Sequence, residues 1–217
     1  MTDMRTMAQV AEQNVGTDGL WVALRALRDG SLTAADWRRV LAMAGKVFSA
    51  NFGSVATPLT FKAQAANRPD AWIRVPSGTI IIPLKEDIVF ETMAGTVTTV
   101  DVREAQNDIG NGTSAAATVP PQSLRTDAPS ASLCTARQLA TADTTAETNP
   151  ISLFRHEYIR ADDAGSNEKN LHIRDEDLGF PILVGPATWE TYIFATTTQA
   201  TGYVVKTWIE LPSNFVQ

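Results

Sequence analysis

Residues 71–102 carry the clearest fold signal in the chain and read AWIRVPSGTIIIPLKEDIVFETMAGTVTTVDV. Short runs of Val, Ile and Thr are separated there by turn residues at Pro76-Ser77-Gly78 and Ala94-Gly95. β-branched residues favour strands, whereas Gly and Pro interrupt them. Strand-like runs that recur about every 8–12 residues are typical of a β-sandwich or barrel.

The same pattern extends to both sides of this stretch. Strands are expected at residues 60–65, 71–75, 79–84, 87–92, 96–102, 151–159, 170–174, 180–184, 188–197 and 203–211. No helical periodicity lies between them, which excludes parallel βαβ units and leaves antiparallel pairing. The last two runs are expected to form a hairpin around residues 199–202. The sequence therefore predicts a mainly β chain with an antiparallel β-sandwich over residues 56–217.

Residues 1–55 differ from the rest and are predicted to form an N-terminal helical arm. Apolar residues recur there at helical spacing in two stretches, Leu20, Trp21, Leu24 and Leu27 and then Trp37, Val40, Leu41, Ala44, Val47 and Phe48. A capping-box variant at Thr33-Ala34-Ala35-Asp36 starts the second helix. Two short helices cannot bury both stripes against each other, so this helical hairpin must pack on the next domain or on another chain.

Residues 104–149 break the strand pattern and are predicted to be a long inserted loop. Gly110-Asn111-Gly112-Thr113, Pro120-Pro121 and Ala128-Pro129-Ser130 are turn signals. Only the run from Cys134 to Leu139 indicates regular structure. A loop of this length is uncommon inside a compact domain, so we expect contacts from outside its own domain to hold it.

Composition and charge argue against several classes of function. The 217 residues carry a formal net charge of −6, which does not favour binding to nucleic acid or to an anionic membrane. The single cysteine, Cys134, excludes an internal disulfide framework and a Cys-based zinc site. No apolar run approaches about 20 residues, and residues 1–15 lack the apolar core of a signal peptide. We expect no membrane span, no direct nucleic-acid binding and synthesis in a cytoplasm.

Catalytic candidates are few. His156 and His172 lie in alternating strands, where a lone histidine is more often a structural hydrogen-bonding residue than a general base. Cys134 has no basic neighbour in the sequence, which favours a small buried hydrophobic residue over a nucleophile. No nucleophile-elbow, phosphate-loop, zinc-protease or dinucleotide motif is present. The chain is therefore not expected to be an enzyme or to need a cofactor.

Acidic residues gather in two predicted turns. Asp162, Asp163, Asp175 and Asp177 are weak candidates for calcium ligands, because calcium prefers carboxylate and other oxygen ligands. Neither turn has the spacing of an EF-hand loop. Solvated surface turns are the favoured interpretation, and no metal site is assigned.

The five tryptophans suit either packing or ligand stacking. Trp72, Trp189 and Trp208 lie in strands among Ile and Val, whereas the other two lie on the helical stripes. Core or interface packing is favoured. The interface candidates are Trp21, Trp37, Phe48 and Trp72.

Three parts of the sequence resemble virion structural proteins of bacterial viruses in style. They are VPSGTIIIPL at 75–84, GNGT at 110–113 with RTDAP at 125–129, and VGP at 184–186 with WIELP at 208–212. Because members of this group are β-sandwich or jelly-roll subunits, the resemblance implies a jelly-roll-like fold over residues 57–212. It implies a capsid, decoration or spike subunit, with no catalytic residues to carry over. The chain departs from many coat proteins in lacking a basic arm, which argues against direct contact with the genome.

The leading hypothesis is therefore a virion structural subunit, made in the host cytoplasm and located in the virion. Its sandwich would form the shell unit, while the N-terminal arm and the long loop would reach over copies of itself and other virion proteins. The alternative is a carbohydrate-binding or adhesive β-sandwich module that uses the three strand tryptophans as a sugar platform. A third hypothesis is a hydrolase that uses His156 or His172 with an acid from residues 162–177.

Overall fold

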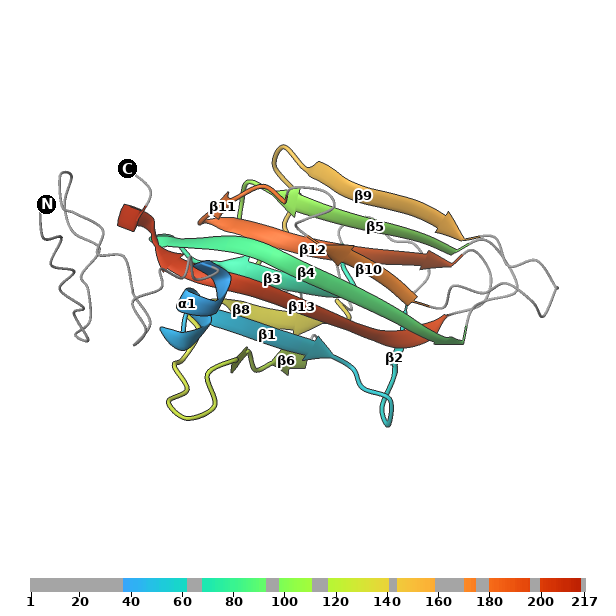
Figure 1. The fold of residues 1–217 in the computed structure, drawn as a ribbon. Coiled ribbons are helices and arrows are strands. Elements are labelled where there is room, and N and C mark those ends of the chain that lie inside the picture. The colour runs from blue at the N-terminus through green and yellow to red at the C-terminus, as the bar shows by residue number, and fades with distance from the viewer. Residues whose placement is uncertain are drawn as a thin grey trace, which may run out of the picture. The chain divides into compact units, whose positions relative to one another are not determined.

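The computed structural model describes residues 37–61, 68–92, 98–110, 117–140, 144–158, 170–174, 180–195 and 200–215. The chain divides into two compact units, residues 1–40 and residues 41–217. The elements in chain order are α1 (Trp37–Met43), β1 (Val47–Phe52), β2 (Leu59–Thr60), β3 (Ala71–Val75), β4 (Thr79–Thr92), β5 (Thr98–Ala105), β6 (Ala117–Val119), β7 (Gln122–Ser123), β8 (Thr135–Gln138), β9 (Ile151–Tyr158), β10 (Asn170–Arg174), β11 (Leu183–Val184), β12 (Ala187–Ala195), β13 (Thr201–Pro212) and the short 3₁₀ helix η1 (Ser213–Phe215) (Figure 1).

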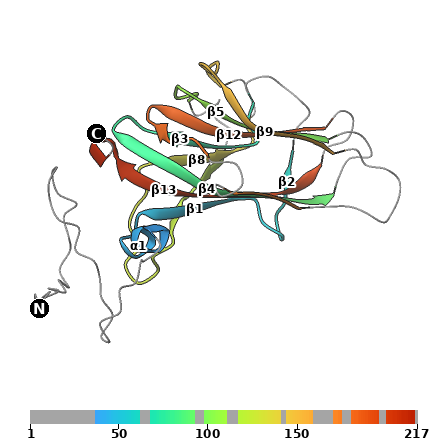
Figure 2. The same ribbon diagram turned by 45° about the horizontal axis from the view of Figure 1, so that its top comes forward.

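The second unit is built from two antiparallel sheets. One has seven strands in the order β10-β4-β13-β1-β7, with β11 also paired to β4 and β2 to β13. The other has six strands in the order β6-β8-β3-β12-β5-β9. Figure 2 shows the two sheets as separate layers, with β1, β4 and β13 in one and β3, β5, β9 and β12 in the other. The predicted mainly β chain with an antiparallel sandwich is confirmed.

Strand alternation determines which side chains enter the core. On β13, Val204, Lys206 and Trp208 are buried, while Val205 and Thr207 between them are only half-buried. This is the period of two that one buried sheet face requires. A charged residue, Lys206, therefore occupies a core-facing position.

Aromatic side chains fill much of the space between the sheets. Trp208 on β13 lies opposite Phe48 on β1, and their rings stack with centroids 6.2 Å apart. From the facing sheet, Trp189 meets Phe180 edge to face at 5.8 Å. Truncating buried aromatic residues of this kind costs about 3–5 kcal/mol. The core between the layers is thus the main source of stability in this unit.

The predicted second helix is shorter than expected, and its C-terminal part is a strand. Leu41 and Ala42 at the end of α1 pack against Ile80 and Ile209 on the outer side of the seven-stranded sheet. Gly45 then adopts a φ of +70°, a left-handed conformation that ends the helix. Residues 47–52 continue as β1, with a mostly buried pattern. The apolar residues at 47 and 48 fit both the helical period of 3.6 and the strand period of two. Pairing within the sheet places them in a strand.

The predicted arm over residues 1–55 is consequently wrong at its C-terminal end. β1 is an internal strand that lies between β13 and β7, so the sandwich begins before residue 56. The first predicted helix falls on residues 20–29, outside the described residues. The helical hairpin therefore reduces to one described helix of seven residues.

Two predicted strand arrangements are also corrected. The expected hairpin between residues 188–197 and 203–211 does not form, because β12 and β13 belong to different sheets. The runs at 79–84 and 87–92 are one continuous strand, β4, which pairs with β13 along its length. A period of two predicts strands but does not state to which sheet each belongs.

The segment 104–149 is more regular than predicted and is bonded to its own domain. β5 extends to Ala105, and β6, β7 and β8 lie within the segment. The Glu210 carboxylate accepts hydrogen bonds from Ser132 Oγ at 2.7 Å and from Leu133 N at 2.6 Å. Thr145 N donates to Ile109 O at 2.8 Å. Contacts within the subunit thus hold the described parts of this segment, contrary to the expectation that outside contacts do so.

Candidate functional site

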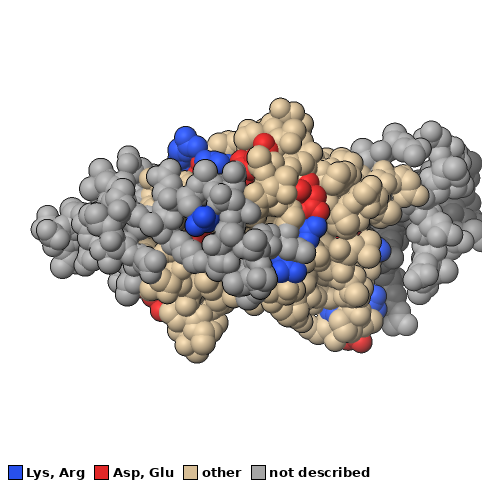
Figure 3. All heavy atoms as spheres, turned by 180° about the vertical axis from the view of Figure 1, so that it is seen from behind, with Lys and Arg blue, Asp and Glu red and all other residues tan. Residues whose placement is uncertain are grey.

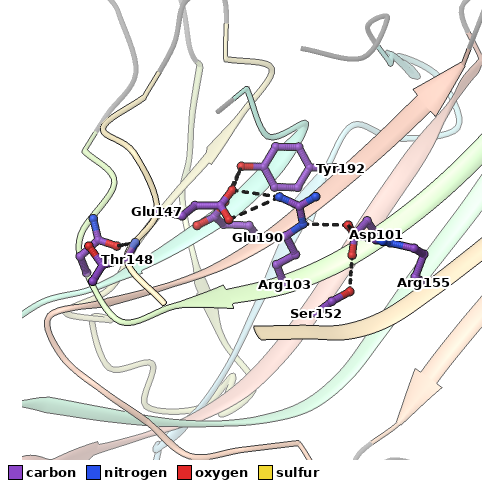
Figure 4. Close-up of polar contacts among 9 residues, drawn as sticks. Asp101, Arg103, Glu147, Thr148, Ser152, Arg155, Glu190 and Tyr192 are labelled. Atoms are coloured by element: carbon purple, nitrogen blue, oxygen red, sulfur yellow. Dashed lines mark hydrogen bonds and ion pairs between the residues drawn. The ribbon is translucent and has the colours of Figure 1, made fainter. Parts of the chain in front are cut away.

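Polar side chains gather on the side of the six-stranded sheet that faces away from the core. We define the outer polar cluster as Asp101, Arg103, Glu147, Glu190 and Tyr192 (Figure 4). β5 and β12 position four of them, since Arg103 lies opposite Glu190 and Asp101 lies opposite Tyr192 in the strand register. The fifth, Glu147, comes from the segment that precedes β9. The neighbouring positions 100 and 102 of β5 face the core, so alternation places 101 and 103 outside it.

Asp101 is the fully buried anion of this cluster. It accepts hydrogen bonds from Ser152 Oγ at 2.6 Å, Arg155 Nη2 at 2.6 Å and Arg103 Nε at 2.7 Å. Burial alone would raise the pKa of Asp101, but these three hydrogen bonds outweigh burial and hold the pKa below its usual range. Asp101 therefore stays ionised and ties β5 to β9.

The Tyr192 hydroxyl lies between two carboxyl groups. Its oxygen is 2.6 Å from Glu147 Oε1 and 2.6 Å from Glu190 Oε2. A phenol has one hydrogen to donate, so only one of the two carboxyls can accept it and the other must itself donate. Burial raises the pKa of Glu190 to about 8; the Tyr192 hydrogen bond opposes this rise and the nearby Glu147 adds to it. Glu190 is accordingly the protonated member at neutral pH.

The outer polar cluster fastens residues 144–149 to the sheet. Arg103 Nη1 lies 3.3 Å from Glu147 Oε1. Alongside it, Asn107 Nδ2 donates to Ala146 O at 3.0 Å, and Asn107 Oδ1 accepts from Thr148 N at 2.6 Å. The cluster therefore attaches residues 144–149 to the sheet through hydrogen bonds and an ion pair, and its Glu190 carboxyl is protonated at neutral pH.

A second group of charges lies inside the sandwich. We define the core lysine cluster as Lys206, Glu86, Glu104, Thr191 and Trp189. Lys206 Nζ is 2.8 Å from Glu86 Oε2, both side chains are fully buried, and the two residues are direct cross-strand partners. The ammonium also lies 4.0 Å from the centroid of the Trp189 ring, a cation–π contact. Thr191 Oγ1 donates to Glu86 Oε1, so the cluster joins the two sheets across the core.

Glu104 completes the core lysine cluster as a neutral acid. It lies opposite Trp189 in the β5–β12 register, and its Oε1 accepts no hydrogen bond from the part of the chain that the structure describes. Burial raises the pKa of Glu104 to about 8, and the charge of Lys206 opposes this rise. Burial likewise lowers the pKa of Lys206, and the Glu86 carboxylate opposes that change. The cluster at neutral pH is thus one ion pair beside one protonated carboxyl.

None of the catalytic candidates predicted from the sequence is a member of either cluster as defined above. His156 is described only as a backbone position of β9, opposite Val100. His172 lies on β10 with 53% of its side chain exposed, and its Nδ1 is 2.8 Å from Asp87 Oδ1. Cys134 belongs to the main core, and burial raises the pKa of its thiol further above its usual range. The predicted packing role of Cys134 is confirmed.

The structure describes the calcium candidates and the interface candidates to different extents. The weak calcium candidates Asp162, Asp163, Asp175 and Asp177 all lie outside the described residues. Of the interface candidates, Trp21 lies outside them as well, and Trp37 is described only as a backbone position of α1. Phe48 and Trp72 are buried within this chain, and Trp72 Nε1 donates to Gly110 O at 3.3 Å. Neither of these two rings presents a surface to a partner.

The burial of the three strand tryptophans argues against the carbohydrate-binding alternative. Trp72, Trp189 and Trp208 are each 0% exposed. A stacking platform requires ring faces that a ligand can reach. The three strand tryptophans are therefore packing residues, as the favoured interpretation held.

Sequence reasoning missed the charged residues of both clusters, although a signal was present. Lys206 stands at the same alternation parity as Val204 and Trp208, which are core residues. Glu104 shares the parity of Val100 and Val102 in the same way. When a charged residue occupies a strand position whose neighbours two residues away are apolar core residues, it is expected to be buried and either paired or neutral.

Among the described residues, no three His, Cys, Asp or Glu side chains gather as a metal site would require, and no helix could cross a membrane. Comparison with protein-family models, curated proteins and solved structures finds no match to this chain.

Proposed function

We propose that this chain is a virion structural subunit whose jelly-roll sandwich assembles with copies of itself and with other virion proteins. The observation that carries the proposal is a nested pattern of strand pairs. β1 pairs with β13, β3 with β12, β4 with β10, and β5 with β9, all antiparallel. The first long strand meets the last, the second meets the second to last, and so on inward. This is the connectivity of a jelly roll, an architecture used by viral capsid proteins as well as by lectins and cupins.

The path between the strands supports the same proposal. Successive strands β1, β3, β4 and β5 alternate between the two sheets, as do β9, β10, β12 and β13. Among these eight strands, only β5 and β9, which flank the long segment 106–150, follow one another within the same sheet. A long two-stranded ribbon wrapped around a core produces this order.

The exposed surface favours assembly over free diffusion. Met43, Leu124 and Leu133 are 57%, 50% and 67% exposed. These three residues lie around the turn between α1 and β1. Leu124 N donates to Val47 O at the start of β1. Leu133 N donates to the Glu210 carboxylate, and Glu210 N in turn donates to Lys46 O in that turn. Figure 3 shows a face on which charged side chains are scattered and most of the described surface is uncharged. Exposed apolar residues that cluster in this way are typical of protein contacts.

The test is the native mass of the purified chain, with negative-stain electron microscopy of the same sample. We expect rings or closed particles that grow with concentration, as obligate subunit contacts produce. Leu133→Asp should weaken assembly, whereas Val55→Asp, at a 73% exposed position on another turn, is the matched control. A chain that stays monomeric at every concentration overturns the proposal, and glycan binding by that monomer would favour the carbohydrate-binding alternative.

A further inference from the structure

Among the described residues, no strand pairs with the outer edge of β9. β9 is the last strand of the six-stranded sheet, and within the described parts of the chain β5 is the strand it pairs with. Residues 154–158 pair regularly with residues 98–102, beyond the bulge at Val102/Arg103. β9 contains neither Pro nor Gly. Its backbone therefore has the features of an edge that can accept another strand.

The sequence of this edge is self-complementary. Residues 154–158 read FRHEY, which is aromatic, basic, histidine, acidic and aromatic. An antiparallel copy centred on His156 places Arg155 opposite Glu157 and Phe154 opposite Tyr158. Opposite charges and aromatic pairs directly across two strands stabilise the pairing. One strand thus carries both halves of a matched contact.

Charge complementarity also selects the register. A pairing centred on position 155 would set Arg155 against its own copy, and one centred on position 157 would set Glu157 against its own copy. Like charges directly opposite each other are destabilising. Of these three pairings, the one centred on position 156 avoids both and also sets opposite charges against each other, and its symmetry is that of an isologous dimer.

We propose that two copies of this chain pair antiparallel along β9, across a twofold axis at His156, so that their six-stranded sheets become one continuous sheet. Arg155 is suited to the contact because its side chain is 61% exposed even though its Nη2 bonds Asp101. The inference deepens the proposed function, on which it rests for the second copy, by naming one contact of the assembly.

A cysteine on the axis tests the pairing. The chain has one native cysteine, Cys134, which is buried, so His156→Cys adds a single new thiol. Directly opposite residues of an antiparallel pair have Cα atoms about 4.5–5.5 Å apart, which a disulfide spans. We expect mild oxidation to give a covalent dimer on a non-reducing gel. Ile151→Cys on the same strand is the matched control, because position 151 and its copy would lie about 30 Å apart.

Charge reversal tests the register. Glu157→Arg in the His156→Cys background sets arginine against arginine at two symmetric places, so the dimer yield should fall at least about tenfold. Adding Arg155→Glu to the same chain restores opposite charges and should restore the dimer. Chains with Arg155→Glu alone and chains with Glu157→Arg alone should cross-link with each other but not with themselves. This rescue separates a contact effect from a folding defect.

The outcomes distinguish this proposal from the proposed function. A covalent dimer that is lost and regained with the charges supports the β9 contact. Large particles whose His156→Cys chains fail to cross-link overturn the contact and leave the virion role standing. A β9 dimer without any larger assembly supports the contact and counts against the virion role. Cross-linking that survives Glu157→Arg overturns the register.

Discussion

The two buried charge clusters both hold a glutamic acid whose pKa is raised to about 8, yet they are closed by different parts of the chain. The core lysine cluster is enclosed by strands of both sheets, and its ion pair is fully buried. The outer polar cluster is closed by Glu147, from a segment without regular structure. Charge inside the sandwich therefore acts on the stability of the whole unit, whereas charge outside it acts on one segment.

The largest effect is expected from Lys206→Met. Methionine fills a similar volume but leaves the Glu86 carboxylate buried and unpaired, and breaking a buried pair in this way costs about 3–5 kcal/mol of the free energy of unfolding. Denaturant unfolding measures the loss. Replacing Glu86 by Met as well removes the stranded charge and should recover most of the stability. If Lys206→Met alone lowers the free energy of unfolding by less than about 1 kcal/mol, water must reach the Lys206–Glu86 pair.

The pH dependence of stability should be the next largest effect. Glu104 and Glu190 both have folded pKa values of about 8, above the usual 4.5, so the folded state binds more protons than the unfolded state between these values. Their contribution to stability is complete below about pH 4.5 and is lost as the pH rises through about 8. Each group contributes a slope of up to about 1.4 kcal/mol per pH unit.

Urea unfolding between pH 5 and pH 9 checks this slope. Glu104→Gln and Glu190→Gln should each flatten it. Stability that rises over this pH range would contradict the protonation of both acids. A slope that flattens with only one variant would show which cluster holds its proton.

Tyr192→Phe should have a smaller and more local effect. It removes the hydroxyl that bridges two carboxyls, at a cost of about 1–3 kcal/mol for the groups left unsatisfied. Hydrogen exchange should rise in residues 144–149 and remain unchanged in β13. Tyr203→Phe, on a half-buried position of the other sheet, is the matched control. Uniformly faster exchange across both sheets would contradict the local role of the outer polar cluster.

The smallest effect is expected from His172→Ala. The pair of His172 with Asp87 lies at an exposed sheet edge, and exposed pairs contribute about 0–1 kcal/mol. Thermal unfolding at neutral pH should shift by no more than a few degrees. A loss comparable with that of Lys206→Met would mean that this edge is buried in an assembly.

Sequence reasoning was strong where a pattern is local and weak where it depends on layers. The run Ala71–Val75 and the run Asn170–Arg174 were predicted within their observed bounds, because β-branched content and alternation are properties of one strand. The same signals could not assign β12 and β13 to different sheets. Sheet assignment depends on contacts between distant residues, which no short window contains.

The candidate sites show the same division. The packing role of Cys134 followed from the lack of a basic neighbour close to it in the sequence. The pairing of Lys206 with Glu86 did not, since it joins positions 120 residues apart. Glu147 lay in a predicted loop, so only the fold could bring it to Tyr192.

The position of β13 in the seven-stranded sheet has a consequence for biosynthesis. β13 lies between β1 and β4, and both of these strands leave the ribosome well before it. Until residues 201–212 emerge, β1 and β4 lack the strand that separates them, and this sheet cannot close. Nascent chains of this protein should therefore keep this sheet incompletely folded until residues 201–212 have emerged, with slow, non-local pairing of β13 completing it.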